Sequence, residues 1–276
     1  MEKIQFMQAT GYDINIKANN ITFCYDDVGK GNIPVLFVHG FPFDKSMWKP
    51  QFDFLKSTHR VIAVDLRGFG KSTDNLEKAS ITLFADDLIK LMDGLDIKKA
   101  IVCGLSMGGY IVLNAVNRFP ERFAGIILSD TQCNADTPEA REKRYKTIQQ
   151  IEADGLIDFA ESFVKNIFSK NSLEERKDQV EKIKKIILST SPKTVAAALV
   201  ALAERWESCS GLNSISVPAL ILCGKEDIIT PPERAEFLHQ NIKNSKIQII
   251  DGAGHMSNIE QSNVFNKHIE DFLSAF

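Results

Sequence analysis

The sequence lacks the features that mark membrane-spanning and nucleic-acid-binding proteins. No stretch approaches the roughly 18 consecutive apolar residues that a transmembrane helix needs, so we expect no membrane partner. Lys and Arg number 33 against 36 Asp and Glu, a formal net charge of −3. The two signs are mixed along the chain, so we expect no nucleic-acid partner. The first ten residues contain neither an apolar h-region nor a cleavage site, which favours a cytoplasmic protein. The oligomeric state stays open.

Cysteine is scarce and has no metal-ligand spacing. The chain has five cysteines, an odd number: Cys24, Cys103, Cys133, Cys209 and Cys223. Three of them, Cys24, Cys103 and Cys223, lie in apolar runs, which favours small buried hydrophobic side chains. A chain of 276 residues can bury a large core without disulfides or metal. The sequence therefore predicts a reducing compartment and no metal site.

Apolar runs alternate with segments of helical periodicity along most of the chain. The runs are mostly continuous rather than alternating, which is typical of strands buried on both faces of a parallel sheet. This rhythm predicts an α/β fold with a doubly wound, mostly parallel sheet. The predicted strands are residues 12–18, 20–26, 34–38, 61–64, 100–103, 124–128, 219–223 and 247–250. The predicted helices around them are residues 81–95, 106–118, 231–241 and 261–276.

One region breaks this rhythm. From about residue 130 to residue 212 no strand signal appears, and the segment is rich in charge and helix formers, as in 139–153 and 173–188. We expect a core of residues 1–130 and 213–276 and a helical cap of residues 131–212 over the carboxyl edge of the sheet. The alternative is a set of packing helices with no role in access.

A candidate nucleophile lies at the end of a predicted strand. Gly104-Leu-Ser106-Met-Gly108 contains the pattern G-x-S-x-G, and here it follows strand 100–103 and opens a helix. A strand that reverses into a helix so quickly forces its central residue into a strained conformation. Glycine on both sides lets strand and helix approach closely. The sequence predicts Ser106 as a nucleophile.

The loop after residues 34–38 is a candidate oxyanion hole. Chemistry at an ester needs two N–H donors aimed at the oxygen that becomes negative. The backbone N–H groups of Met107, directly after the nucleophile, and of Phe41, after the turn at Gly40, are the expected donors. His39 precedes them, and we expect it to anchor the loop by hydrogen bonds rather than to act in catalysis.

Three motifs together resemble those of the α/β-hydrolase superfamily. They are residues 39–42 (HGFP), 65–72 (DLRGFGKS) and 104–109 (GLSMGG). Within the superfamily the chain resembles the esterase, cofactor-free perhydrolase and 3-oxoadipate enol-lactonase group. The resemblance covers nearly the whole chain and implies an eight-stranded sheet, a cap after the sixth strand, no metal and no organic cofactor. It defines the fold much more closely than the substrate.

The resemblance also implies where the remaining catalytic residues lie. In this fold the acid and then the histidine follow the nucleophile along the chain. The family pattern Gly-x-x-Asp after strand 219–223 implies Asp227, with Glu226 and Asp130 as alternatives.

The last predicted strand is followed by a loop that ends in His255, which we expect to reach Ser106 as the general base. Asp251 in the same loop is the less favoured acid. The other histidines outside the motifs lie in charged stretches and are expected on the surface: His59, His239 and His268.

A serine esterase acting on short-chain carboxylic esters is the expected function. The predicted triad would form an acyl-enzyme, release the alcohol and hydrolyse the acyl group with water activated by His255. Dehalogenases and epoxide hydrolases of this fold use an aspartate nucleophile, so Ser106 argues against both. A C–C bond hydrolase or an aminopeptidase stays possible, and so does a receptor that binds a small molecule without turnover.

An enol-lactone hydrolase is the closest rival. In such lactonases a tryptophan and then an arginine typically follow Thr-Pro-Glu, whereas here the segment after 137–139 (TPE) carries Arg141 and Arg144. The arginine matches and the tryptophan does not. Arg144 is therefore a candidate for binding a substrate carboxylate, although it lies in a charged run typical of a solvated helix face.

Apolar residues of the predicted cap are candidates for an acyl pocket. Phe163 and Trp206 are the preferred members of this set, and internal packing of the cap is the alternative. The full set is Phe159, Phe163, Ile167, Leu199 and Trp206.

Overall fold

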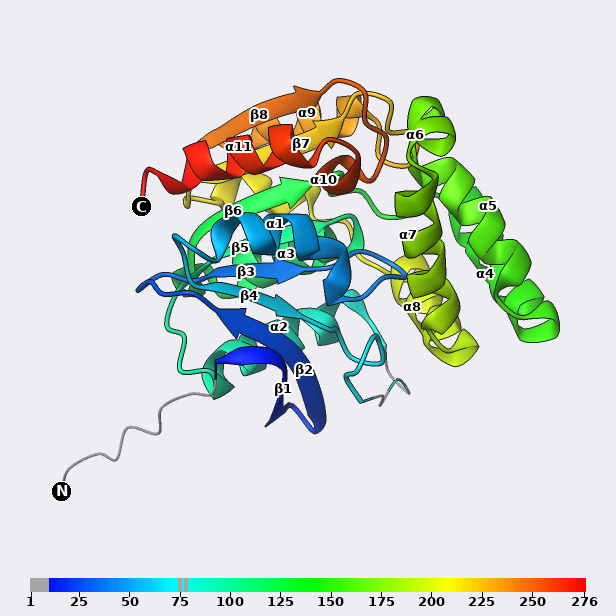
Figure 1. Ribbon diagram of the computed structural model, residues 1–276, viewed down its shortest axis with the longest axis horizontal. Coiled ribbons are helices and arrows are strands. Elements are labelled where there is room, and N and C mark those ends of the chain that lie inside the picture. The colour runs from blue at the N-terminus through cyan, green and yellow to red at the C-terminus, as the bar shows by residue number, and fades with distance from the viewer. Residues whose placement is uncertain (1–9, 74–75, 77–78) are drawn as a thin grey trace.

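A computed structural model describes residues 10–73, 76 and 79–276, and its core is one eight-stranded sheet (Figure 1). The strand order is β1-β2-β4-β3-β5-β6-β7-β8. β1 and β2 form an antiparallel hairpin and β2 pairs antiparallel with β4, whereas all pairs from β4 to β8 are parallel. The strands are β1 Gly11–Ala18, β2 Ile21–Val28, β3 Val35–Val38, β4 Val61–Val64, β5 Ala100–Leu105, β6 Phe123–Ser129, β7 Ala219–Gly224 and β8 Ser245–Ile250.

All eight predicted strands are present, and their burial explains the continuous apolar runs. Every residue of β3, β4, β5 and β7 is buried, because helices cover both faces of the sheet. β1 at one edge alternates between exposed and half-buried residues, as a strand with one solvated face does. The predicted α/β fold with an eight-stranded, mostly parallel sheet is confirmed.

Helices pack against the two faces of the sheet in two separate apolar clusters. α2 (Ile81–Gly94), α3 (Met107–Arg118) and α9 (Pro232–Asn241) bury Phe84, Val112 and Leu238 on one face. α1 (Lys49–Leu55) and α11 (Ser262–Leu273) bury Phe52 and Phe265 on the other. The short helices are α10 (Ser257–Glu260) and the 3₁₀ segments Lys45–Trp48, Pro120–Arg122 and Cys209–Ser214.

The predicted C-terminal helix, residues 261–276, differs at its start. The structure places the short helix α10 before it and breaks the two at Gln261, whose φ is −128° and ψ is 50°. Polar residues in α10 are fully buried, so its position depends on tertiary contacts that periodicity does not reveal.

The region without strand signal forms a helical insertion between β6 and β7, residues 131–212. It consists of α4 (Pro138–Asp154), α5 (Ile157–Ile167), α6 (Lys170–Glu175), α7 (Lys177–Ser189) and α8 (Pro192–Ala203), followed by the start of the last 3₁₀ segment. Side-chain caps set several of the starts: Thr137 caps α4, Ser169 caps α6 and Ser191 caps α8. The predicted helix 173–188 is divided at Arg176 into α6 and α7.

The helical insertion gathers at one end of the molecule, beyond the end of β6 (Figure 1). It contacts loops that follow strands of the core. Thr190 Oγ1 donates a hydrogen bond to Pro42 O at 3.4 Å, and Thr194 Oγ1 donates one to Gly68 O at 3.0 Å. Pro42 follows β3 and Gly68 follows β4, so the insertion lies over the carboxyl ends of the parallel strands.

No single helix in the described part of the chain is long and apolar enough to cross a membrane. α7 and α8 meet that length and composition only together, and they are bent by 95° at their junction.

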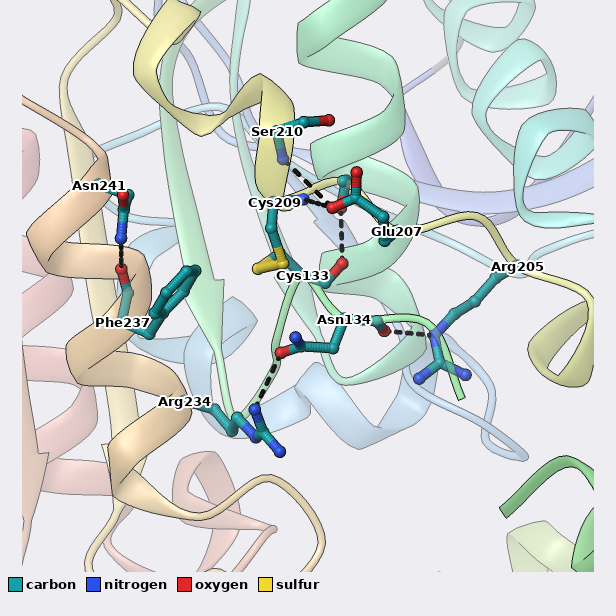
Figure 2. The surroundings of a disulfide bond; sticks show 10 residues. Cys133, Asn134, Arg205, Glu207, Cys209, Ser210, Arg234, Phe237 and Asn241 are labelled. Atoms are coloured by element: carbon teal, nitrogen blue, oxygen red, sulfur yellow. Dashed lines mark hydrogen bonds between the residues drawn. A yellow bond between two sulfur atoms is a disulfide. The ribbon is translucent and has the colours of Figure 1, made fainter. Parts of the chain in front are cut away.

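The prediction of small buried side chains is confirmed for the three cysteines that it named, and the other two form a disulfide that was not predicted. Cys24, Cys103 and Cys223 are free and buried. Cys133 and Cys209 form a disulfide with their Cα atoms 4.9 Å apart (Figure 2). The two are separated by 76 residues, and only the fold brings the start and the end of the helical insertion together. Because disulfides persist in oxidising compartments, the argument for a reducing compartment is lost.

Candidate active site

Ser106 occupies a sharp turn between β5 and α3. Its φ is 54° and its ψ is −113°, a strained conformation for a residue with a side chain. A Cβ added to Gly104 would lie 2.4 Å from the carbonyl oxygen of Gly108, and one added to Gly108 would lie 2.3 Å from Val38 O. Glycine is therefore required at both positions, and the strand–turn–helix setting predicted from the sequence is present.

Neighbouring strands hold this turn in place. The backbone N–H of Ser106 donates to Ser129 O at 3.0 Å, and Thr131 Oγ1 donates to the carbonyl oxygen of Ser106 at 2.8 Å. Leu105 and Met107 on either side are completely buried, whereas Ser106 is half-buried. The turn therefore presents the serine side chain at the surface of a rigid edge.

His255 and Asp227 form a buried pair in the loops after β8 and β7. The distance from His255 Nδ1 to Asp227 Oδ2 is 2.8 Å, and the two residues are 3% and 2% exposed. The backbone N–H of Thr230 donates to Asp227 Oδ1 at 3.0 Å, and its hydroxyl donates to Oδ2 at 2.9 Å. These bonds fix the carboxylate. They engage Nδ1 of the imidazole ring, so Nε2 is the nitrogen left to act on Ser106.

Burial and charge act in opposite directions on this pair. Burial lowers the pKa of His255, but the adjacent charge and hydrogen bond of Asp227 outweigh it, so the net pKa is raised from 6.5. Burial raises the pKa of Asp227, but His255 and the hydrogen bonds from Thr230 lower it more. Asp227 therefore stays ionised and favours a protonated imidazole beside it.

The register of the parallel strands brings these groups to one edge. Leu105 at the end of β5 is opposite Ser129 at the end of β6, and Gly224 at the end of β7 is opposite Ile250 at the end of β8. Ser106, Asp227 and His255 all follow these positions. The described residues show no hydrogen bond from Ser106 Oγ to His255, and such contacts often tighten only in the substrate complex.

Asp130 is buried beside the pair but has its own partners. Its carboxylate accepts hydrogen bonds from Ser257 Oγ at 2.5 Å and from the backbone N–H of Gly224 at 2.8 Å. Burial and the charge of Asp227 raise its pKa to about 7. The two remaining candidate acids lie on the surface: Glu226 is exposed, and Asp251 is exposed and pairs with Lys225.

Ligand atoms of Asp130, Cys223 and Asp227 lie within 4.8 Å of one another, which raises the question of a metal. Burial raises the pKa of the Cys223 thiol and so disfavours the thiolate form that a metal would need. Both oxygens of Asp227 are already bonded to His255 and Thr230. The donor set does not fit a metal ion, because a metal needs the thiolate and free carboxylate oxygens.

The loop after β3 lies directly against Ser106. A Cβ added to Gly40 would lie 3.1 Å from Leu105 O and 3.4 Å from Ser106 Cβ. Phe41 follows Gly40 and precedes a cis peptide bond to Pro42. Met107 is the first residue of α3, so its N–H has no acceptor within the helix. The two predicted oxyanion donors therefore come from the segments that flank the serine.

His39 has the anchoring role that the sequence predicted. It is completely buried, and its Nε2 accepts a hydrogen bond from the N–H of Leu66 at 3.0 Å. Its Nδ1 lies 2.8 Å from Gly40 O. Burial lowers its pKa, which agrees with a neutral ring that accepts at one nitrogen and donates at the other.

The structure brings one of the three predicted substrate-binding residues to the candidate oxyanion loop. Phe163 stacks on Phe159 with ring centroids 5.3 Å apart and meets the ring of Phe41 edge-on at 5.9 Å. Ile167 and Leu199 are buried, which agrees with internal packing of the helical insertion.

Trp206 is not brought to Ser106. It is 87% exposed and lines a different cavity of about 180 Å³ together with Tyr110 and Arg205. The described lining of that cavity contains neither Ser106 nor His255. Trp206 follows α8 in the segment that returns to the core.

Arg144 is held by an acid. Its Nε bonds to Asp136, whose other oxygen accepts from Arg205 Nη1 at 2.6 Å. The side chain of Asp136 is only 5% exposed, and its carboxylate pairs with the guanidinium groups of both Arg144 and Arg205. Asp136 thus neutralises only one of the two guanidinium groups, and the carboxylates of Glu204 and Glu207 line the cavity beside Arg205.

Two functional candidates escaped the sequence analysis. Thr230 holds Asp227, and its signal is local: an aspartate that accepts N–H bonds from residues two and three positions later is a recurrent turn. Glu260 is fully buried and bonds to the residue before His255, and its partners are distant in sequence.

Comparison with known proteins agrees with this geometry. A family model described as the alpha/beta hydrolase fold matches residues 33–262. The chain belongs to the α/β-hydrolase family. A 3-oxoadipate enol-lactonase of Acinetobacter baylyi is 32% identical over 248 residues, which is 90% of this chain and 91% of that protein.

Solved structures support the same assignment. A thermophilic esterase from Thermogutta terrifontis has a TM-score of 0.91 at 36% identity and covers 95% of this hydrolase and 98% of its own chain. An enol-lactonase from Burkholderia xenovorans has a TM-score of 0.88 at 27% identity, with 95% and 100% covered. The chain is thus similar both to esterases and to enol-lactonases, which supports hydrolase activity.

Proposed function

We propose that this α/β hydrolase is a serine carboxylesterase with Ser106, His255 and Asp227 as its catalytic triad. The observation that carries the proposal is the conformation of Ser106, which is strained, flanked by obligatory glycines and placed at the edge that also carries His255 and Asp227. Strain of this kind is retained where the position of a side chain has a function.

In the proposed mechanism His255 accepts and returns one proton in each of the two half-reactions. His255 Nε2 removes the proton of Ser106 Oγ as the oxygen attacks the ester carbonyl, and Asp227 stabilises the imidazolium that forms. The proton then passes to the leaving alcohol, and an acyl group stays on Ser106. His255 then removes a proton from water as the water attacks the acyl carbon. The bond between the acyl carbon and Ser106 Oγ breaks, the imidazolium returns the proton to Oγ, and the acid is released.

The backbone N–H groups of Phe41 and Met107 would stabilise the negative oxygen of each tetrahedral intermediate. Their supporting observation is the contact of Gly40 with Leu105 and Ser106, since it holds the two donor segments together. No cofactor or metal enters this scheme.

We propose that residues 131–212 act as a cap and that residues 1–130 and 213–276 form the catalytic core. The aromatic cluster of Phe41, Phe159 and Phe163 joins the cap to the candidate oxyanion loop, and apolar rings there suit a short acyl chain. The expected partner is a small-molecule ester, with no nucleic acid and no membrane. A cytoplasmic location stays a prediction.

An enol-lactone hydrolase is the second candidate. Its supporting observations are the named relatives and the shared carboxylate of Asp136, which leaves one of Arg144 and Arg205 without a full counter-charge. A cation of this kind could bind a substrate carboxylate. If an enol-lactone exceeds acetate and butyrate esters in kcat/KM by a hundredfold, and Arg144→Ala removes that advantage, the lactonase assignment replaces the esterase.

The test of the proposal is turnover of nitrophenyl acetate, butyrate and octanoate by the purified protein. We expect burst kinetics and faster hydrolysis of the two short esters. A receptor of the same fold would bind small molecules without turnover, so complete absence of hydrolysis on all esters and lactones would favour that alternative.

A further inference from the structure

Glu260 in α10 is a fully buried carboxylate whose two oxygens bond to two different parts of the chain. Oε1 accepts from the backbone N–H of Gly254, directly before His255, at 2.8 Å. Oε2 accepts from the backbone N–H of Ser169, at the junction of α5 and α6 in the helical insertion, also at 2.8 Å. A single side chain thus connects the histidine loop to the insertion.

The same two segments also touch through their backbones. A Cβ added to Gly254 would lie 2.8 Å from Ser169 N and 3.0 Å from Phe168 C. This approach leaves no room for a side chain before His255 and aligns both N–H groups with one carboxylate. Two independent observations, the shared carboxylate and the backbone contact, therefore define one junction.

A buried carboxylate at this position lowers the stability of the fold, so its presence calls for a functional reason. Burying a charge is costly, and Glu260 is bonded by two neutral amides, with no cation among its described hydrogen-bond or ion-pair partners. A neutral side chain with one acceptor could satisfy only one of the two N–H groups. The charge and the double acceptor fit a function in placing the loop.

We propose that Glu260 is a positioning residue that fastens the His255 loop to the helical insertion and sets the orientation of the imidazole. This inference rests on the proposed esterase function for its kinetic consequence, but not for its structural one. Movement of the insertion at Ser169 would then move His255, so that a displaced cap leaves the base misplaced.

The charge of Glu260 adds an electrostatic consequence. The charged groups that act on His255 are Asp227 after β7, Asp130 after β6 and Glu260 in α10, and each of them favours the imidazolium. The insertion contributes the backbone of Phe168 and Ser169 at this point. Neutralising Glu260 should therefore lower the pKa of His255 as well as loosen its loop.

The first experiment replaces Glu260 by Gln and compares it with Glu270→Gln. Glu270 is exposed on α11 and pairs with Lys267, so its variant controls for loss of one charge nearby. In Glu260→Gln we expect exchange of the Gly254 and Ser169 amide hydrogens to accelerate together by about tenfold or more. We expect kcat on a short ester to fall by about ten- to a hundredfold with little change in KM. The acid limb of kcat/KM should move to lower pH, and Glu270→Gln should resemble the wild type.

The second experiment removes the other partner and keeps the carboxylate. Ser169 has φ −63° and Phe168 before it is extended, so both accept proline at position 169. Ser169→Pro lacks the N–H and places a methylene against Glu260, whereas Ser169→Ala loses only the hydroxyl that caps α6. We expect Ser169→Pro to have at least a tenfold lower kcat than Ser169→Ala.

The outcomes separate three cases. Wild-type kcat and pH profile in Glu260→Gln would overturn the inference. So would a lower kcat with an unmoved acid limb and equal activity of the two Ser169 variants, because that pattern describes a purely structural residue. If Ser106→Ala keeps its activity, the esterase mechanism fails, yet joint loss of amide protection at Gly254 and Ser169 would still support the junction.

Discussion

The carboxyl edge of the sheet and the helical insertion reach their side-chain arrangements by different routes. At the edge, strand direction and register place Ser106, Asp227 and His255 after neighbouring strand ends, and obligatory glycines fix the turn geometry at Ser106. In the insertion, contacts between residues far apart in the chain hold side chains in place, as the pairing of Arg205 with Asp136 illustrates. The proposed chemistry therefore depends on motifs at the edge, whereas the proposed selectivity depends on packing in the insertion.

The largest expected effect on activity comes from substitutions at the carboxyl edge of the sheet. Ser106→Ala and His255→Ala should each lower kcat by about 10⁴-fold or more while the fold is kept, because members of a triad act as a unit. The double variant should be little worse than either single one. Steady-state kinetics with Ser274→Ala as an exposed control checks this, and activity of Ser106→Ala within tenfold of the wild type would contradict it.

The next effect concerns the seam between the two regions. The Cys133–Cys209 disulfide joins the start of the helical insertion to its return segment, 76 residues later (Figure 2). Cys209→Ser should lower the free energy of unfolding by about 2–4 kcal/mol, since the crosslink limits the unfolded chain. Urea unfolding with and without a reducing agent measures this. Equal stability of oxidised wild type and variant would show that the seam contributes nothing.

A smaller effect tests selectivity in the insertion. Phe163→Ala removes a ring from the cluster with Phe41 and Phe159, so the ratio of kcat/KM for butyrate over octanoate esters should fall by about tenfold. Trp206→Ala is the matched aromatic control, and it should change that ratio less than twofold because Trp206 lines a separate cavity. If Trp206→Ala changes the ratio by about tenfold and Phe163→Ala does not, Trp206 and not Phe163 belongs to the substrate site.

The smallest effect is in pH dependence at the edge. The raised pKa of His255 predicts that kcat/KM falls below a pH somewhat above 6.5, because the base must be neutral to act. The carboxylate of Asp130 raises this pKa to the extent that it is ionised, which requires a pH near or above its own pKa of about 7, so Asp130→Asn should move the acid limb to lower pH. If the acid limb of the variant's kcat/KM profile stays in place or moves to higher pH, this electrostatic assignment is contradicted.

Asp130 also predicts a change in stability with pH. Its pKa is raised from 3.8 to about 7, so its contribution is most favourable below 3.8 and is lost as pH rises through 7. Asp130→Asn should therefore gain stability relative to the wild type between pH 5 and pH 8, measured by urea unfolding. A constant difference across this range would mean that Asp130 does not titrate there.

Sequence patterns predicted the sheet and the turn at Ser106 because both are encoded locally. Continuous apolar runs report burial on both faces, and Gly104 and Gly108 report close approach of strand and helix. The break at Gln261 and the division of 173–188 at Arg176 were not predicted, since tertiary contacts override helix periodicity there.

Residues that act through distant partners were beyond the sequence. Cys133 and Cys209, like Glu260 and Ser169, are brought together only by the fold. Trp206 was predicted as a pocket residue from its type alone, and its type does not encode its direction. The triad was predicted from the order of the three residues along the chain and from the motif around Ser106. Its catalytic role stays a proposal that kinetic experiments must test.

The most direct test of the central claim is covalent labelling of the nucleophile. A fluorophosphonate should react with one equivalent of the protein, and peptide mass spectrometry should place the adduct on Ser106. Labelling should slow as pH falls below the pKa of His255 and should be lost in Ser106→Ala. An adduct on another serine, or unchanged labelling of Ser106→Ala, would contradict the assignment of Ser106 as the nucleophile.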